Sequence, residues 1–353
     1  MSRKALKAQS LRPLLEAVQS DAARVVAPVE EAGKRLFRPV ETVEAITFEE
    51  ENTAWSFKEF LFPRTETLFH YRLKSAGVEL AEPALSEGET VIFGARPCDA
   101  ASVALLDAVF APGGRKMPDG RVEPDDPFYP RRRAQTTIIG VSCAEPGPAC
   151  FCTAVGLSPT GTLGSDVLLT RVGEEYLVEA STEKGERFLE QYAQFLTETE
   201  ATKSEVTAAA EAKIRRTDPV RIDLDAPLPE LFKSARLEEM ARACLGCGAC
   251  AFICPTCHCF DIADEGNAVS GSRCKFWDSC GQACFTMHTS GHNPRPNQPS
   301  RYRNRLLHKL RYIPERFGVH GCVGCGRCAL TCPVNMDIYE VARAVEDERE
   351  TRL

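Results

Sequence analysis

Two cysteine runs in the last third of the sequence constrain this chain more than any other feature. Residues 244–255 read CLGCGACAFICP, and residues 322–333 read CVGCGRCALTCP. Both have the spacing C-x2-C-x2-C-x3-C-P, which binds [4Fe–4S] clusters in bacterial ferredoxins. Glycines between the cysteines let the backbone approach a cluster closely and adopt positive φ angles. The sequence therefore predicts two [4Fe–4S] clusters.

The same spacing predicts how the ligands are shared. The cysteine before proline usually ligates the other cluster of a pair. For the first cluster we expect Cys244, Cys247, Cys250 and Cys332. For the second we expect Cys254, Cys322, Cys325 and Cys328. Structural zinc is the alternative for a single C-x2-C pair, but two complete runs that end in proline argue against it.

Composition predicts a soluble protein of about two domains. The chain has 353 residues and 17 cysteines, of which 13 lie between positions 244 and 332. We find neither a secretory apolar segment nor an apolar run long enough to span a membrane. We therefore expect a cytoplasmic protein with reduced or metal-bound thiols. The net charge of −7 argues against nucleic acid as a partner.

The N-terminal part reads as an α+β or α/β domain over residues 1–225. Apolar runs at 90–95 and 136–141 indicate buried strands, and a helix over 100–110 follows the first, with Asp99 as its N-cap. A helix over 4–19, a strand pair over 25–48 and a hairpin over 166–180 complete the expected elements, with two polar helices over 182–217.

The proline-bearing segment 218–229 predicts a connector to a second domain over 226–353. The stretch between Cys254 and Cys322 is long enough for two or three helices, such as one over 301–313. A further helix over 337–348, with Asp337 as its N-cap, is expected after the last cluster ligand. These features favour a mostly helical, ferredoxin-like dicluster domain.

Four N-terminal thiols form a possible third site. Cys98 and Cys143 both follow predicted buried strands, whose carboxyl ends meet at one edge of a sheet. The possible ligands of an extra iron–sulfur cluster there are Cys98, Asp99, Cys143, Cys150 and Cys152. The alternative is a set of buried thiols and an Asp99 that only caps a helix.

Five further cysteines and most histidines lie among the cluster motifs. The cysteines are alternate ligands, part of another metal site, or small buried hydrophobes: Cys257, Cys259, Cys274, Cys280 and Cys284. The histidines are expected to supply hydrogen bonds or positive charge near the clusters: His258, His288, His292, His308 and His320. A G-x-G-x-x-G fingerprint, a Walker A motif and a nucleophile motif are all absent from the sequence.

Several motifs together resemble one family of iron–sulfur subunits. They are 94–99 (GARPCD), 140–147 (GVSCAEPG), 150–152 (CFC), 164–166 (GSD), 276–280 (FWDSC) and 291–296 (GHNPRP). With the cysteine runs, these motifs are similar to those of the beta subunit of cytoplasmic NADP-dependent nickel–iron sulfhydrogenases and of the related iron–sulfur subunit of anaerobic sulfite reductase. The similarity extends from about Phe60 to Ile338.

The resemblance implies a role in electron transfer within a hetero-oligomer. A family member passes electrons between a catalytic or relay subunit, of hydrogenase or sulfite reductase type, and a flavoprotein diaphorase subunit. It also supports the eight ligands above and an N-terminal cluster, and no catalytic residue is implied. Two alternatives stay open: a stand-alone iron–sulfur redox sensor or ferredoxin-like module, and an oxidoreductase with its own substrate site beside Cys98 and Cys143.

Overall fold

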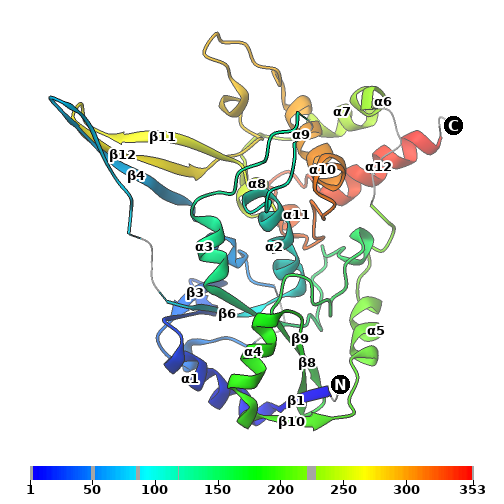
Figure 1. The fold of residues 1–353 in the computed structure, drawn as a ribbon. Coiled ribbons are helices and arrows are strands. Elements are labelled where there is room, and N and C mark those ends of the chain that lie inside the picture. Colours follow the sequence, from blue (N-terminus) through cyan, green and yellow to red (C-terminus); the bar gives the residue numbers. More distant parts are fainter. Residues whose placement is uncertain (1–2, 49–51, 85–87, 118, 221–227, 352–353) are drawn as a thin grey trace.

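The computed structural model describes residues 3–48, 52–84, 88–117, 119–220 and 228–351, and its largest unit is a mixed sheet (Figure 1). The strand order is β10-β1-β9-β8-β7-β6-β2-β3, with the pairs β2–β6, β6–β7 and β7–β8 parallel. Its strands are β1 (Arg3–Lys7), β2 (Arg24–Glu31), β3 (Lys34–Val40), β6 (Thr90–Ala95), β7 (Thr136–Val141), β8 (Val167–Val172), β9 (Glu175–Ala180) and β10 (Leu196–Thr199).

Helices cover both faces of this sheet, which is why its central strands are apolar without alternation. Val91 and Phe93 of β6 pack with α1 (Leu11–Asp21) and α4 (Glu183–Gln191). Ile92 faces the other way, towards α2 (Pro97–Phe110). Two shorter helices of this region are α3 (Tyr129–Ala134) and α5 (Ser204–Ala212). The predicted strand pair, hairpin, buried strands and helix after β6 are therefore confirmed.

The helix expected over residues 4–19 is wrong in its first part. Residues 4–6 form the middle of β1, which pairs with β9 on one side and β10 on the other. Ala5 and Leu6 are fully buried there, so sheet pairing overrides the helical spacing. The helix begins at Leu11, and Pro13 lies in its first turn, where no backbone N–H is needed.

A second sheet joins segments that are far apart in the sequence. Its order is β11-β12-β4-β5, all antiparallel, and it projects as a long arm in Figure 1. The strands are β4 (Thr65–Lys74), β5 (Gly77–Ala81), β11 (Phe260–Gly266) and β12 (Ser270–Trp277). A hairpin thus occupies part of the stretch between the cysteine runs where we expected helices. Its alternation of apolar and polar residues, Phe260 to Ile262 and Arg273 to Phe276, suits a strand.

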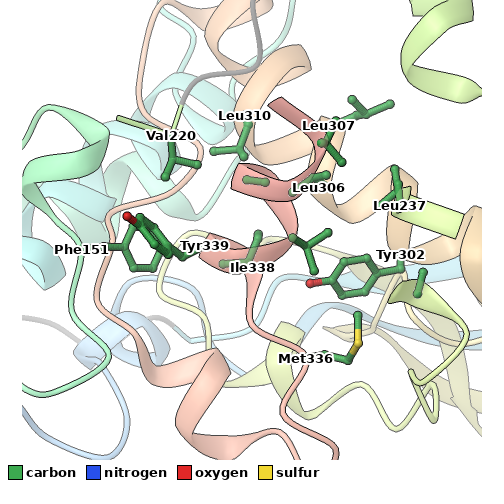
Figure 2. Packing of buried hydrophobic residues seen from close by; sticks show 14 of the residues in the cluster. Phe151, Val220, Leu237, Tyr302, Leu306, Leu307, Leu310, Met336, Ile338 and Tyr339 are labelled. Atoms are coloured by element: carbon green, nitrogen blue, oxygen red, sulfur yellow. The ribbon is translucent and has the colours of Figure 1, made fainter. Parts of the chain in front are cut away.

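Helices joined by loops follow in the C-terminal part and pack around its core. They are α6 (Leu228–Phe232), α7 (Ala235–Ala241), α8 (Ala249–Phe252), α9 (Gln298–Leu307), a π-helical turn (His308–Tyr312), α10 (Ile313–Phe317), α11 (Arg327–Thr331) and α12 (Ile338–Glu350). Figure 2 shows Leu306, Leu307 and Ile338 at the centre of this core, with Phe151 packed on Tyr339 at 5.3 Å between ring centroids. The helix predicted after the second run is confirmed, and the Asp337 side chain accepts a hydrogen bond from the Tyr339 amide. None of the helices described is long and apolar enough to cross a bilayer.

Aromatic rings and a buried cation join the arm to the large sheet. The Phe62 ring stacks on Trp277 at 5.8 Å and lies 5.0 Å from Phe110 of α2. Lys275 of β12 is buried and forms ion pairs with Glu66 and Asp126, each at 2.8 Å. Both contacts link residues before position 218 with residues after position 229, whereas most of the connector predicted between them, 221–227, lies outside the described residues.

We predict that Phe62→Ala will lower the free energy of unfolding by about 3–5 kcal/mol, because it leaves a cavity between α2 and Trp277. Denaturant titration followed by tryptophan fluorescence measures the change. Leu80→Ala, at a side chain 63% exposed on β5, is the matched control and should shift stability by less than about 0.5 kcal/mol. Equal effects of the two substitutions would contradict this packing.

Candidate iron–sulfur centres

The two cysteine runs fold into the same loop shape. Gly248 (φ 76°, ψ −10°) starts α8, and Gly326 (φ 70°, ψ −10°) starts α11 in the same left-handed conformation. Both positions require glycine, because only glycine adopts this conformation without steric cost. A Cβ on Gly326 would also lie 2.4 Å from the Ala149 carbonyl oxygen. The repeat in sequence is therefore a repeat in structure.

Five of the predicted ligands line one cavity. Four are the set expected for the first cluster, Cys244, Cys247, Cys250 and Cys332, and the fifth is Cys328, which we expected at the second cluster. The Gln298 amide donates to the Cys244 sulfur at 3.2 Å, and the Met336 backbone N–H donates to the Cys332 sulfur at 3.1 Å. The structure thus brings the last cysteine of one run beside the first three of the other. The rim is open at Cys247 and at Leu245, which is 66% exposed.

The other predicted set is more deeply placed. Cys254 is buried and lies close enough to Cys322, Cys325 and Cys328 to influence all three thiols. Burial raises the pKa of Cys322 to about 11, and the neighbouring Cys254 thiolate adds to this rise. Burial likewise raises the pKa of Cys325 and Cys328. Ionised thiols at this depth need a compensating charge, which a metal centre supplies.

Three buried cations converge on the segment from Cys250 to Cys257. Lys309, in the π-helical turn, has its Nζ 3.2 Å from the Cys254 sulfur and donates to Thr256 Oγ1 and the Gly321 carbonyl at 2.7 and 3.1 Å. Such turns are frequent at functional sites. Lys58 and Arg305 supply the other two charges to this segment.

Both of these cations reach backbone carbonyls of the first run and its flank. Lys58 donates to the carbonyls of Cys254 and Cys257 at 3.0 and 2.9 Å. Arg305 donates to the Cys257 sulfur at 3.3 Å and to the Cys250 carbonyl at 2.9 Å. The segment is therefore held from three sides by charge-assisted hydrogen bonds.

No carboxylate of the described residues forms an ion pair with Lys58, Arg305 or Lys309. Burial lowers the pKa of Lys58 to about 8, and burial alone would also lower that of Lys309, but the Cys254 and Cys257 thiolates raise it. A buried charge without a partner is very costly. The sulfur ligands must therefore provide the negative charge, and this donor set fits a thiolate-ligated, anionic cluster.

Side chains that could ligate a single metal ion are spaced apart in this structure. In the described ranges, no three His, Cys, Asp or Glu side chains come together closely enough to hold one ion.

The four N-terminal thiols gather at the carboxyl edge of β6 and β7, where we expected them. The Asn52 side chain lies between two of them, at 3.8 Å from the Cys150 sulfur and 3.9 Å from the Cys98 sulfur. Burial raises the pKa of Cys150 to about 11 and of Cys152 to about 12, and the nearby Cys143 contributes to both. These thiols also adjoin the second run, because Phe151 N–H donates to the Gly324 carbonyl at 2.8 Å.

Asp99 does not have the role of N-cap that its position suggests. Helix α2 begins at Pro97 with Arg96 as its N-cap, and the Asp99 carboxylate pairs with Arg327 at 2.5 and 2.8 Å. Both side chains are buried, at 0% and 4% exposure. The carboxylate is therefore occupied by a guanidinium. Since Arg327 lies between Cys325 and Cys328, this ion pair anchors the second run on the large sheet.

The remaining cysteines divide between buried and exposed positions. Cys274 and Cys280 are buried, Cys257 and Cys259 are half-buried, and Cys284 is exposed. The Cys280 thiol lines the first cavity and contacts Cys259. Cys257 lies against Cys254 and Arg305.

Two histidines lie close to the cations and stay neutral. Burial lowers the pKa of His258 to about 4 and of His308 to about 3. His258 supplies the expected hydrogen bond, from Nδ1 to the Thr256 carbonyl at 3.0 Å. The positive charge beside the thiols comes instead from lysine and arginine, among them Lys58 and Arg327, for which the sequence indicates no such role. Each is brought to its site by contacts about 200 residues apart in sequence.

Comparison with known proteins agrees with these observations. Residues 243–336 match the family model of the 4Fe-4S dicluster domain. The chain is 28% identical over 330 residues to the sulfhydrogenase 2 subunit beta of Pyrococcus furiosus, with 92% of each chain covered. The resemblance to this kind of iron–sulfur subunit is confirmed, and the C-terminal part contains a dicluster domain.

We predict that Asp99→Asn will lower the free energy of unfolding by about 3–5 kcal/mol, since it leaves the buried Arg327 charge without a partner. Chemical denaturation measures this change, and iron analysis of the same sample separates stability from ligation. Glu198→Gln, at a pair whose glutamate is 72% exposed, is the control and should have almost no effect. Unchanged stability with loss of iron would instead make Asp99 a ligand.

Proposed function

We propose that this chain is the electron-transfer subunit of a multi-subunit oxidoreductase in the cytoplasm. It relays electrons between a flavoprotein diaphorase subunit that uses NAD(P) and a catalytic module of hydrogenase or sulfite reductase type. The observation that carries the proposal is the cavity in which Cys332 joins Cys244, Cys247 and Cys250. The dicluster match supports an iron–sulfur role, and the relative's name describes a subunit of a larger assembly.

Each part of the chain has a defined task in this proposal. The first centre is held by Cys244, Cys247, Cys250 and Cys332, and the second by Cys254, Cys322, Cys325 and Cys328. Each bound cluster would accept and donate one electron at a time, and this step needs no substrate site in the chain. The residues around the clusters bury Cys254 of the second centre, stabilise its charged form through Lys309, and hold the Cys250–Cys257 segment in place through Arg305.

The N-terminal thiols make a third centre in the same proposal, with Cys98, Cys143, Cys150 and Cys152 as its ligands. Its support is the gathering of these thiols next to the second run, where the Cys150 sulfur lies 3.8 Å from the Cys325 carbonyl. Asp99 is not included, because Arg327 occupies its carboxylate. Three centres would then extend from the large sheet to the surface at Leu245.

This proposal keeps the two domains, residues 1–225 and 226–353, as the units of the chain. The first carries the third centre and the second carries the two ferredoxin-type centres. The arm and the Arg327–Asp99 pair join them. Such a joint holds the centres at fixed separations, as a relay requires.

We predict about twelve irons and as many acid-labile sulfides per chain after anaerobic purification, because each cubane carries four irons. Cys150→Ser should reduce this to about eight. Cys274→Ser is the matched control, since this buried cysteine faces Thr67 in the arm, and it should leave the iron content unchanged. A wild-type content of about eight would remove the third centre but keep the other two.

We also predict that Cys332→Ser and Cys244→Ser will alter the same EPR signal of the reduced protein, because both residues ligate the first centre. Cys254→Ser should alter the signal affected by Cys325→Ser. If Cys332→Ser instead grouped with Cys325→Ser, each run would bind its own cluster, and the shared ligation would be wrong. Colourless protein that contains zinc would overturn the proposed function itself.

A further inference from the structure

The two proposed centres differ in the charge of the groups that face their ligands. At the first centre the donors to sulfur are neutral: the Gln298 amide and the Met336 backbone N–H. At the second centre the donor to the Cys254 sulfur is the ammonium of Lys309, at 3.2 Å. Lys309 is 3% exposed, so solvent does not screen its charge.

Other charges near the two centres do not cancel this difference. Arg305 faces both, since it donates to the Cys250 carbonyl and lies close enough to Cys254 and Cys328 to act on their thiols. Arg301 borders the first cavity but is half-buried and donates to the Gln298 oxygen and the Arg295 carbonyl. Arg327 is near the second centre but is neutralised by Asp99. Lys58 adds a further charge beside Cys254 and Cys257.

We propose that Lys309 makes the second centre the electron acceptor of the pair, with the higher reduction potential. This inference rests on the proposed function. A fixed positive charge stabilises the added electron of a reduced cluster, and its effect is large where solvent is excluded. Neutral hydrogen bonds to sulfur act in the same direction but less strongly.

The geometry then gives electron flow a direction through the chain. The first centre has an exposed ligand, Cys247, beside the exposed Leu245, and the second, whose Cys254 is buried, lies between it and the N-terminal thiols. Electrons delivered at the exposed loop therefore pass inward to the second centre. Lys309 is a positioning charge in this scheme and takes part in no chemical step.

An anaerobic redox titration of the full chain, followed by EPR, tests the inference. The signals are first assigned with Cys332→Ser and Cys254→Ser. In the wild type, the signal altered by Cys254→Ser should have the higher midpoint. Lys309→Met should lower that midpoint by a roughly tenfold change in the equilibrium constant, about 59 mV for one electron, and leave the other signal in place.

Two further variants keep the test decisive if Lys309→Met fails to fold or to bind its iron. Lys309→Arg keeps the charge and should retain the wild-type midpoint. Lys58→Met should lower the same midpoint in the same direction, and it decides the matter if Lys309→Met loses iron. If the wild type contains eight or more irons but the first centre has the higher midpoint, the inference is wrong and the proposed function stands. The same holds if neither lysine variant shifts the midpoint of the second centre. Fewer than eight irons in the wild type would overturn the proposed function.

Discussion

The buried ion pair between Arg327 and Asp99 fixes the relation between the two halves of this chain. Arg327 sits inside the second cysteine run, and Asp99 sits in the first turn of α2, directly after a central strand of the large sheet. Gly324 and Gly326 allow the loop around Arg327 to lie against residues 149–152 without clashes. The second cysteine run and the N-terminal thiols are neighbours because of this contact, and the proposed relay depends on their proximity.

Charge balance is the second constraint on the architecture. Lys58, Arg305 and Lys309 are buried around the segment from Cys250 to Cys257, and their partners are sulfur atoms and backbone carbonyls. Isolated cations would be unstable at this depth, and so would several thiolates. Together they are mutually stabilising once a metal centre holds the thiols in their charged form. The protein surroundings are therefore matched to an anionic cofactor.

Sequence reasoning succeeded where the signal was local. The cysteine spacing, the apolar runs of β6 and β7 and the turn at Gly173 each lie within a few residues, and each indicates one structure. It failed where distant pairing decides the outcome. β1 has helical spacing but is fixed by β9 and β10, and the β11–β12 hairpin is completed by β4. Asp99 looked like a helix cap because its partner Arg327 lies 228 positions away. Lys58 gave no signal, because its site is assembled by the fold.

The arm has a consequence for how the chain is made. β4 is translated long before β12, so the nascent polypeptide carries a strand edge with unpaired N–H and C=O groups until the ribosome has added roughly 200 more residues. Such an edge is open to wrong pairing with other chains. Completion of the four-stranded sheet also brings Lys58 onto the Cys254–Cys257 segment. The proposed second centre, with Cys254 among its ligands, can therefore be completed only after this late part of the chain has been made.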